Sequence, residues 1–557
     1  MESVAGDVPR PSRGRVVMLV DNDVRGDSRV QKIARSAAAA GWEVILLGER
    51  RDAPVESWQL GEAEVRLVEL NSDLAMPPTT FTRSLLRRPL AYPPGRMANY
   101  RLGIARARRA DVRMRIATLR ARRADGGSRL REVAGLGLLA APWAAAKAMH
   151  RWARFRARET NRLKAARRDE RALLNTIPIS FWKAVLGRRA WRRLDPGLWR
   201  WELSFGRVID RLKPDIIHAH DFRMIGVGAR ATMRARASGR RVKLVWDAHE
   251  YAPGLRPRPN TPRWLPAVVA HEKEYAPYAD AVVTVSSSLA ELLRTEHKLP
   301  VLPDVVMNAP VSGAPEETDS TPVPDLRTLC GVGSETPLLA YCGGITPVRG
   351  VNVMIDALPD LPGVHIALVS LHPNGKNATS DEAFARAEDL GVADRVHLLP
   401  YVPHWQVAQF LAPADAAVSP LVHLSNHEIA LSNKFFEYSQ ARLPLITSDV
   451  RTMAEMVRST GQGEVFRAED VTDYVRAVKT VLADPERYRA AYDRPGLLEG
   501  WTWEAQAAVL DRVYTGLLRD RAGASPAVPA GKPTAVPATQ VATPSDSNRQ
   551  AEVGSRR

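Results

Sequence analysis

Short runs of apolar, β-branched residues alternate with amphipathic segments along most of the chain. Residues 16–20 form such a run, a polar loop occupies residues 21–27, and residues 28–40 then place apolar side chains at helical spacing. Another short apolar run follows at residues 44–47. A strand, a helix and a second strand joined in this way predict a parallel sheet with helices packed on its faces.

The same alternation returns in two further series that are separated by a break. The first series predicts strands at residues 216–219, 242–246 and 281–285. A polar stretch rich in Pro, Ser and Gly follows near Pro310 and predicts a linker. The second series then predicts strands at residues 338–342, 365–369, 396–399, 416–419, 445–447 and 464–466. We therefore expect two doubly wound α/β domains, with a cleft between the carboxyl ends of their strands, where such sheets bind ligands.

Length and composition are those of a multidomain globular protein. The chain has 557 residues, enough for two or three domains, and its 45% hydrophobic and 25% charged residues disfavour wholesale disorder and a polytopic membrane protein. Cys330 and Cys342 are too few for a disulfide framework or a structural zinc site. Residues 1–14 contain no apolar run of signal-peptide length, so we expect a cytoplasmic protein.

The positive charge of the chain is concentrated in one segment. Residues 81–200 contain 31 Lys and Arg against 7 Asp and Glu, whereas the whole chain contains 79 and 62. The rest of the chain therefore has a balance of −7, from 48 basic and 55 acidic residues. The basic segment lacks strand–helix alternation and is predicted to be mainly helical. This pattern indicates an interaction surface added to an ordinary body.

Aromatic residues in the basic segment suggest what this surface binds. Five tryptophans are interleaved with its arginines: Trp143, Trp152, Trp182, Trp191 and Trp199. Basic residues and Trp on helices favour an anionic membrane surface, and we expect the protein to be peripheral on the inner face of the membrane through residues 81–202. The alternatives are solvated structural helices and nucleic-acid binding, for which no recognition module is visible. Residues 133–146 are apolar but too short to span a bilayer.

Polar residues follow the first predicted strand. Gly26 and Asp27 lie in the loop that opens the helix at residue 28. Backbone N–H groups in such a loop can bind an anionic or hydroxyl-rich ligand. Asp27 could instead serve only as the N-cap of the helix.

Polar residues also follow two later strands of the first half. His220 ends the run that begins at residue 216, and His249 and Glu250 follow the next strand. Imidazoles can hydrogen-bond sugar hydroxyls or position a leaving phosphate near neutral pH. A metal held by His218, Asp221 and His249 is disfavoured, because their spacing matches no metal-binding motif.

The first strand of the second half ends in paired glycines. Gly343 and Gly344 permit close backbone approach to a phosphate, and Arg349 can neutralise that phosphate bidentately. The glycine spacing is that of neither a P-loop nor a Rossmann fingerprint.

A later helix begins with groups suited to a diphosphate. Ser432, Asn433 and Lys434 offer donors and positive charge at its N-terminus. Glu437, one turn later, can accept hydrogen bonds from a ribose diol. The alternative is an ordinary surface pair between Lys434 and Glu437.

Taken together, these features resemble the retaining glycosyltransferases of the family-4 type, which have the GT-B architecture of two facing Rossmann-like domains. The resemblance rests on the order and spacing of residues 27–30 (DSRV), 214–220 (PDIIHAH), 247–250 (DAHE), 279–286 (ADAVVTVS), 307–310 (MNAP), the turn from Gly343 to Gly350, and 433–438 (NKFFEY). It covers roughly residues 15–80 and 203–515 and leaves the basic segment and the C-terminal tail unmatched.

The resemblance implies roles for the residues already singled out. Arg349 and Lys434 are expected to hold the donor diphosphate, and His220 is expected to lie beside the transferred sugar; these three form the expected catalytic set, without a metal. Glu437 is expected to bind the nucleotide ribose. Further donor-binding residues would be Gly343, Gly344, Ser432 and Asn433, and the acceptor and sugar side would comprise Gly26, Asp27, Arg29, His249 and Glu250.

The chain departs from the family pattern at two positions. The paired-glutamate motif of the family places its first Glu at position 429, which is Ile429 here, with Glu428 one residue earlier. Gly344 stands where many members have an arginine. We therefore expect the loop that contacts the sugar to differ from that of most members.

The expected function is retaining transfer of a hexose from a nucleotide-diphosphate sugar, UDP- or GDP-linked, to a hydroxyl of a lipid-linked or cell-envelope glycan, with no cofactor. Such a reaction needs stabilisation of the departing diphosphate more than a strong base. A GT-B phosphorylase or a nucleotide-sugar epimerase would share the donor site. From another class, the alternative is an inactive scaffold with a membrane- or nucleic-acid-binding insert.

We expect the chain to divide into six parts: residues 15–80 with 203–312 as the acceptor domain, 81–202 as the basic helical insert, 313–335 as linker and domain entry, 336–495 as the nucleotide-sugar donor domain, 496–518 as a C-terminal helix packing back across the domains, and 519–557 as a disordered tail.

Overall fold

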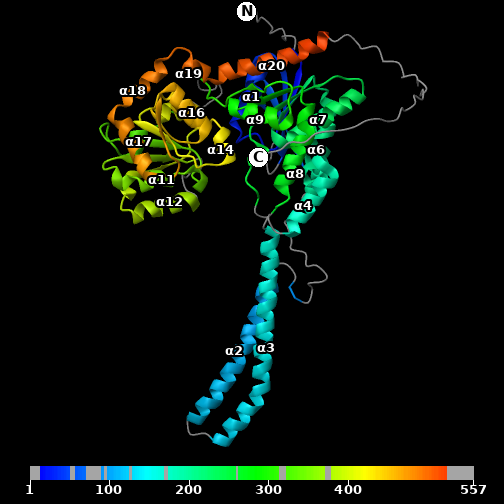
Figure 1. Ribbon diagram of the computed structural model, residues 1–557, viewed down its shortest axis with the longest axis vertical. Helices are drawn as coiled ribbons and strands as arrows, with labels where there is room; N and C mark the ends of the chain where they lie inside the picture. Colours follow the sequence, from blue (N-terminus) through cyan, green and yellow to red (C-terminus); the bar gives the residue numbers. More distant parts are fainter. Residues whose placement is uncertain are drawn as a thin grey trace, which may run out of the picture.

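The protein consists of two α/β domains side by side, a long helical hairpin that projects from the first of them, and a C-terminal helix that crosses between the domains (Figure 1). The computed structural model describes residues 13–50, 57–70, 90–92, 97–124, 128–168, 173–258, 261–312, 322–370 and 378–523. The predicted tail beyond residue 523 and the first part of the predicted linker, residues 313–321, lie outside these ranges.

The first domain is built on an eight-stranded sheet of order β3-β4-β2-β1-β5-β6-β7-β8. Its strands are β1 (Arg15–Leu19), β2 (Glu43–Arg50), β3 (Ser57–Leu60), β4 (Ala63–Glu69), β5 (Ile216–His220), β6 (Lys243–Ala248), β7 (Ala281–Thr284) and β8 (Asp304–Val305). The pairing is parallel, as predicted, except between β3 and β4. The sequence analysis missed this antiparallel pair, because β3 is a short and largely exposed edge strand without an apolar run.

The helices of the first domain cover both faces of its sheet. The main ones are α1 (Ser28–Ala39), α6 (Trp199–Leu212), α7 (Asp221–Ala237), α8 (Trp264–Tyr275) and α9 (Ser287–His297). The strands between them are buried on both faces, which is why they appear in the sequence as continuous apolar runs.

The second domain has a six-stranded, fully parallel sheet of order β11-β10-β9-β12-β13-β14. Its strands are β9 (Leu338–Cys342), β10 (His365–Val369), β11 (Val396–Leu399), β12 (Ala416–Ser419), β13 (Leu445–Ser448) and β14 (Gly463–Phe466). Its helices include α11 (Asn352–Asp356), α12 (Ala378–Asp389), α13 (Val407–Leu411), α14 (Ser425–Ile429), α15 (Asn433–Gln440), α16 (Arg451–Thr460) and α17 (Val471–Ala483). Two Rossmann-like sheets therefore form the architecture, which confirms the predicted fold class.

The strand order places the loops that carry polar residues. In the first sheet β1 lies between β2 and β5, and in the second β9 lies between β10 and β12. The loops after β1 and β5, and those after β9 and β12, therefore leave the sheets at the points where the strand order reverses. At such switch points the loops diverge and leave room for a ligand.

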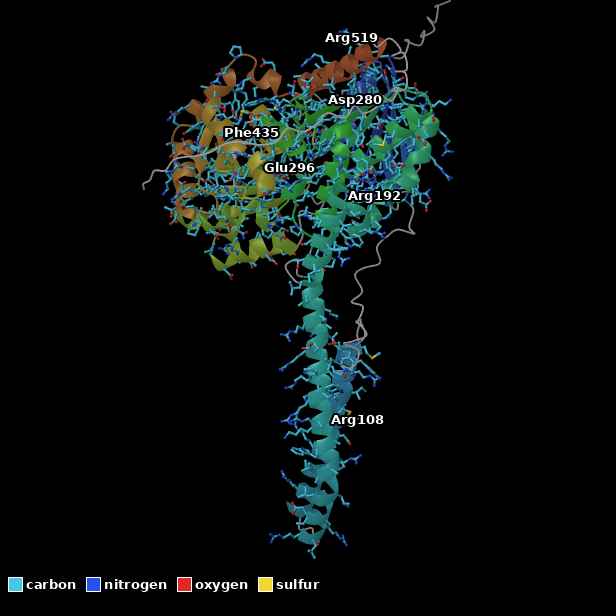
Figure 2. The ribbon with its side chains drawn as sticks, turned by 45° about the vertical axis from the view of Figure 1, so that its right-hand side comes forward. Arg108, Arg192, Asp280, Glu296, Phe435 and Arg519 are labelled. Atoms are coloured by element: carbon cyan, nitrogen blue, oxygen red, sulfur yellow. The ribbon has the colours of Figure 1, made fainter. Side chains whose placement is uncertain are left out.

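The segment predicted as a basic helical insert, residues 81–202, is helical over most of its described part and forms two portions. Helices α2 (Met97–Ala124) and α3 (Arg129–Arg168) form an antiparallel hairpin that stands away from both domains (Figures 1 and 2). Helices α4 (Leu173–Leu186) and α5 (Trp191–Leu194) pack instead against the first domain. Trp191 is fully buried there, and its Nε1 donates to Glu274 of α8 at 2.6 Å. Trp182 and Trp199 pack on the same core, so three of the five tryptophans stabilise the domain rather than a surface.

The C-terminal helix α20 (Trp503–Gly523) follows the second domain but packs on the first. Trp503, Leu510, Tyr514 and Leu517 join the core beside β1 and α1. Asp511 forms an ion pair with Arg13 at 2.7 Å. The helix extends five residues beyond the expected end at residue 518.

Among the described helices, none has both the length and the apolar character that crossing a bilayer requires.

Candidate active site

A cleft of about 920 Å³ lies between the two domains at the carboxyl ends of their strands. Its lining includes ten of the thirteen expected site residues: Gly26, His249, Glu250, Gly343, Gly344, Arg349, Ser432, Asn433, Lys434 and Glu437. Asp27 and Arg29 instead line an adjoining cavity of about 430 Å³, which shares Gly26, Ser28 and Asn433 with the cleft. His220 is buried behind the cleft and lines neither cavity.

The loop after β1 is held by its own side chains. Asn22 Oδ1 accepts from the amide of Val24 at 2.8 Å, and Asn22 Nδ2 donates to Asp27 at 2.9 Å. Asp27 also accepts from an amide in the first turn of α1 at 3.2 Å and is the N-cap of that helix. Gln31 donates to two carbonyls of the loop at 2.9 Å. The side chain of Asp27 therefore acts as the cap, and the loop presents Gly26 to the cleft.

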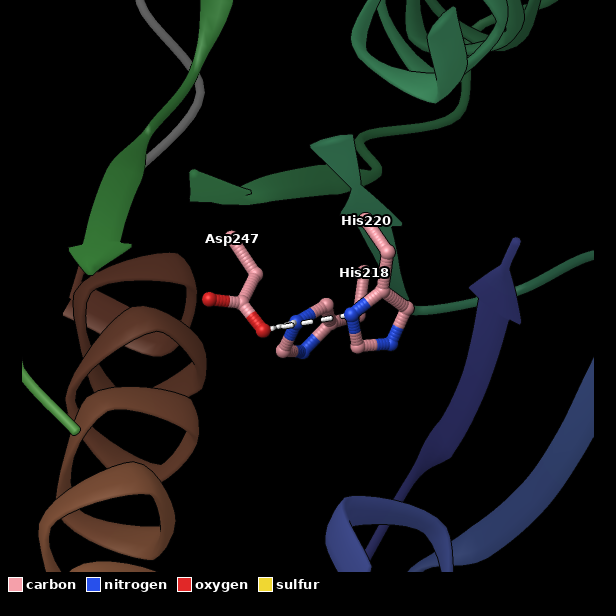
Figure 3. Close-up of side chains that lie close together, drawn as sticks. All are labelled: His218, His220 and Asp247. Carbon is pink, nitrogen blue, oxygen red and sulfur yellow. Dashed lines mark hydrogen bonds and ion pairs between the residues drawn. The ribbon is translucent and has the colours of Figure 1, made fainter. Parts of the chain in front are cut away.

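A buried ion pair lies beneath the first-domain side of the cleft. Arg29 donates to both carboxylate oxygens of Asp247, at 2.8 and 3.1 Å, and the two side chains are 4% and 0% exposed. The same carboxylate accepts from His220 at 3.1 Å and from His249 at 2.8 Å. Figure 3 shows Asp247 facing His218 and His220. Burial alone would raise the pKa of Asp247, but its cationic and hydrogen-bonding partners hold that pKa well below the usual value.

His249 connects this buried cluster to the cleft. Its Nε2 faces Asp247 and its Nδ1 lies 3.3 Å from Asp221. Burial lowers the pKa of His249, but Asp221 and Asp247 outweigh burial and raise that pKa well above the usual value. Burial, together with the charge of Asp221, raises the pKa of the neighbouring Glu250. The cleft therefore has a cationic imidazole beside a carboxyl group on its first-domain side.

His220 is set back from the cleft wall. It is 1% exposed, and its ring stacks on that of His218 with centroids 4.4 Å apart. Because Asp247 can only accept, Nδ1 of His220 donates to it, and the tautomer with this proton has the lone pair on Nε2. This buried Nε2 has no partner among the described residues.

Three of these groups could in principle ligate a metal, since atoms of His218, His220 and Asp247 lie within 4.8 Å of one another. The donor set does not fit a cation well. Arg29 already donates to both oxygens of Asp247, and Nδ1 of His218 is hydrogen-bonded to the hydroxyl of Tyr514 at 2.5 Å. A divalent cation bound here would lie beside the buried guanidinium of Arg29, and the two positive charges would repel each other. We therefore assign no metal to this cluster.

On the second-domain side, the turn after β9 makes room for Lys434. Gly343 has a φ of 138°, and a Cβ at this position would collide with the side chain of Lys434. Lys434 is the second residue of α15, whose N-cap position is Ser432. Its Nζ lies 5.4 Å from the ring centroid of Tyr341. A side chain at position 343 would therefore displace the lysine from the cleft.

Arg349 and Lys434 are cations without counter-ions. Among the described residues, neither side chain has a hydrogen-bond or ion-pair partner, although both line the cleft. Burial and the nearby Arg349 lower the pKa of Lys434 to about 8. Burial raises the pKa of Glu437, against the opposing effect of Lys434. Lys434 and Glu437 thus both face the cleft and form no ordinary surface pair.

The two residues that depart from the family pattern, Gly344 and Ile429, both line the cleft. Ile429 lines it, whereas Glu428 is turned away and accepts from the amide of Arg451 at 2.8 Å. The carbonyl of Ile429 accepts from Ser286 of the first domain at 2.5 Å. Glu250 and Glu437 are the two carboxylates among the described lining residues. Glu428 therefore does not replace the missing motif glutamate.

One part of the cleft wall was missed by the sequence analysis. The loop after β11 contributes Tyr401, Val402, His404 and Trp405. Their position in the sequence could have indicated them, because they directly follow a strand that the apolar pattern predicts. They contain no charged or glycine-rich motif, so nothing in their composition drew attention to them.

Two family matches cover about half of the chain. Residues 165–308 match the family described as Glycosyltransferase Family 4, and residues 336–484 match that described as Glycosyl transferases group 1. The chain belongs to the family-4, group 1 glycosyltransferases, a family of retaining GT-B proteins. The first match begins at residue 165 rather than near residue 203, in agreement with the packing of α4 and α5 on the first domain.

Individual known proteins are similar to different lengths of this chain. The D-inositol 3-phosphate glycosyltransferase of Nocardia farcinica is 27% identical over 219 residues, which are 37% of this chain, and the chain spans about half the length of this curated relative (47%). Sucrose-phosphate synthase from Thermosynechococcus elongatus superposes with a TM-score of 0.57 and 14% identity, covering 91% of this chain and 100% of that one. Anabaena HepE, solved with UDP and glucose, gives a TM-score of 0.52 and 12% identity, covering 90% and 100%. These two structures share the fold.

Proposed function

We propose that the protein transfers a hexose from a nucleotide-diphosphate sugar to an acceptor hydroxyl with retention of configuration. The observation that carries the proposal is the pair of cations, Arg349 and Lys434, which line the cleft and whose side chains form no ion pair with a described residue. Two positive charges in one cleft, that of Lys434 at the N-terminal end of α15, favour a ligand with two adjacent negative charges, such as a diphosphate.

The same charges suit the chemistry of transfer. The bond between the anomeric carbon and the diphosphate oxygen breaks, the acceptor oxygen bonds to that carbon on the same face, and the acceptor proton leaves with the diphosphate. Negative charge grows on the diphosphate as the bond breaks. Preorganised cations in a partly dry cleft stabilise that charge more than water does. In this scheme His220 serves the sugar from behind the cleft wall, and Glu437 binds the ribose.

The donor is proposed to be a UDP- or GDP-hexose. HepE, which has the same fold, was solved with UDP and glucose. Tyr401 and Trp405 supply aromatic faces in the same cleft, on which a base can stack. An inactive scaffold would retain the fold but would not turn over any donor.

The first prediction tests donor binding. We expect a UDP- or GDP-hexose to raise the melting temperature of the full chain, because a ligand that binds only the folded state stabilises it by about 2.7 kcal/mol at a hundred times its Kd. Glu437→Gln should reduce this shift for nucleosides and nucleotide sugars alike. The measurement is a thermal-shift panel of UDP-, GDP- and ADP-sugars, followed by hydrolysis of the stabilising donor without acceptor. A panel without any shift, and without hydrolysis, would favour the inactive scaffold.

The acceptor is proposed to be a lipid-linked or cell-envelope glycan, because the helical hairpin of α2 and α3 suits an anionic membrane surface. The two helices contain twenty basic and three acidic residues, a balance equal to the +17 of the whole chain. Many side chains of the hairpin extend into solvent along its length (Figure 2). Trp143 and Trp152 are 40% and 49% exposed, and Leu130 and Leu138 are more than three-quarters exposed. Basic residues with exposed aromatic and aliphatic side chains are typical of an interfacial helix.

The second prediction tests this docking on vesicles. Reversing three exposed arginines on one stripe of α2, Arg106→Glu, Arg113→Glu and Arg120→Glu, should weaken binding to phosphatidylserine-containing vesicles roughly a hundredfold or more, since each basic residue near the surface contributes about 1 kcal/mol. The measurement is co-sedimentation at low salt, and added salt should weaken binding of the parent protein.

The matched control reverses three exposed cations of the first-domain body, Arg236, Arg294 and Lys298. This control should bind vesicles as the parent does. Equal loss in both variants would point to net charge alone and contradict a role for the hairpin. Retention of the parent on duplex DNA with a steep salt dependence, and not on vesicles, would favour nucleic acid instead.

A further inference from the structure

Helix α20 places a tyrosine against the buried histidines of the first domain. Tyr514 is fully buried, and its hydroxyl lies 2.5 Å from Nδ1 of His218. Its ring makes edge contacts with Trp42 and with His218, at centroid distances of 5.6 and 5.8 Å. No family match covers this residue, because the second match ends at residue 484. The tyrosine therefore comes from the segment that follows the donor domain.

The direction of this hydrogen bond follows from the surroundings of the two groups. Burial raises the pKa of Tyr514 well above its usual value, so the phenol keeps its proton. Burial and the neighbouring His220 lower the pKa of His218 to about 4, so the imidazole is neutral near pH 7. Because Nε2 of His218 faces the carboxylate of Asp247, we assign the ring proton to Nε2, and the phenol then donates to Nδ1. Nε2 faces Oδ2 of Asp247 at 3.6 Å.

The same carboxylate oxygen orients His220. Oδ2 of Asp247 lies 3.1 Å from Nδ1 of His220, and the two imidazole rings are stacked at an angle of 26°. Rotation of the His218 ring would therefore disturb both the stacking and the hydrogen-bonding of His220. The groups that face His218 are Tyr514 from α20, His220 from β5, Asp247 from β6 and Arg29 from α1.

We propose that Tyr514 is a positioning residue for glycosyl transfer: by donating to His218 it holds that ring in one tautomer and orientation, and through the shared carboxylate of Asp247 it fixes the direction in which His220 presents Nε2. This inference rests on the proposed function, in which His220 serves the sugar. Helix α20 would then contribute to activity as well as to packing, because its position against the first domain determines where the Tyr514 hydroxyl lies.

The experiment compares Tyr514→Phe with a matched tyrosine. Phenylalanine keeps the ring against Trp42 and removes only the hydroxyl. Tyr492→Phe is the control, since Tyr492 is also buried and its hydroxyl donates to a backbone carbonyl, that of Leu443, at 2.6 Å in the second domain. We expect Tyr514→Phe to lower kcat about tenfold with an unchanged KM for the donor, whereas Tyr492→Phe keeps kcat at a similar melting temperature.

The pH profile supplies a readout that a purely structural role would not move. A donor to Nδ1 stabilises the neutral form of His218, so its removal makes the ring easier to protonate. Protonated His218 would compete with His220 for Asp247, and the acid limb of kcat should therefore move to higher pH in Tyr514→Phe. His218→Gln combined with Tyr514→Phe should cost no more than the larger single change, because both act through one ring.

The outcomes separate the role of Tyr514 from the proposed function. A wild-type kcat and pH profile for Tyr514→Phe, with His220→Ala strongly impaired, would overturn the role of Tyr514 and leave the proposed function intact. Equal loss of kcat in Tyr514→Phe and Tyr492→Phe would mean that the loss comes from reduced stability, and it would also overturn the role of Tyr514. Full activity of His220→Ala would refute the role of His220 in the proposed function.

Discussion

Lys434→Ala and Arg349→Ala are each expected to lower kcat/KM for the nucleotide sugar roughly a hundredfold to a thousandfold, the effect of removing one preorganised group that stabilises charge in a transition state. Both side chains line the cleft, and among the described residues neither has a counter-ion. Their charge is therefore available to a ligand, and its removal leaves the departing diphosphate undercompensated. Steady-state kinetics with the donor identified by the thermal-shift panel measures the loss.

Lys479→Ala is the matched control, because Lys479 is an exposed lysine on α17 of the same domain and does not line the cleft. Its kcat/KM should be that of the parent. Wild-type kcat/KM in both Lys434→Ala and Arg349→Ala would contradict the donor site.

The pH dependence of donor binding gives an independent check. The pKa of Lys434 is lowered to about 8, so the free enzyme loses this charge, and donor affinity should fall, as pH rises through that value.

Arg29→Met is expected to destabilise the protein by about 3–5 kcal/mol, the range for removing one partner of a buried ion pair. Methionine keeps much of the volume of arginine and removes its charge. Asp247 would then remain buried without the guanidinium that contacts both of its oxygens. Urea unfolding of the two proteins at neutral pH measures the difference in free energy.

Arg489→Met is the control, because Arg489 pairs with Glu486 on the surface, where the carboxylate is 75% exposed, and such a pair contributes less than about 1 kcal/mol. The pH dependence has a definite sign. The folded-state pKa of Asp247 is depressed, so its contribution is present above the pKa of the unfolded carboxyl group and is lost as pH falls through the folded value. The stability difference between the parent and Arg29→Met should therefore be greatest at neutral pH and shrink as the pH falls toward the folded-state pKa of Asp247 in the parent. Similar effects of the two substitutions on the free energy of unfolding would contradict the assignment.

Much of the fold follows from local pattern. The six strands of the second sheet were predicted within a residue at each end, because the strands of a parallel sheet are marked in the sequence by short apolar runs. The edge strand β3 was missed for the opposite reason, since it is exposed and has no such run. On the donor side, Arg349, Lys434 and Glu437 were singled out as charged residues after strand ends, and the structure gathers them in one cleft.

The sequence by itself determined the two parallel α/β domains and the strand ends at which charged residues gather, because periodicity and strand-end position are local properties. Only the tertiary structure decided which of these residues line the cleft. Asp27 became a helix cap, Glu428 turned toward α16, and His220 was buried behind Asp247. Trp191 became core, while Trp143 and Trp152 remained exposed on the hairpin. These differences depend on partners far away in the chain, such as Glu274 for Trp191 and Tyr514 for the histidines, and no local pattern encodes such contacts.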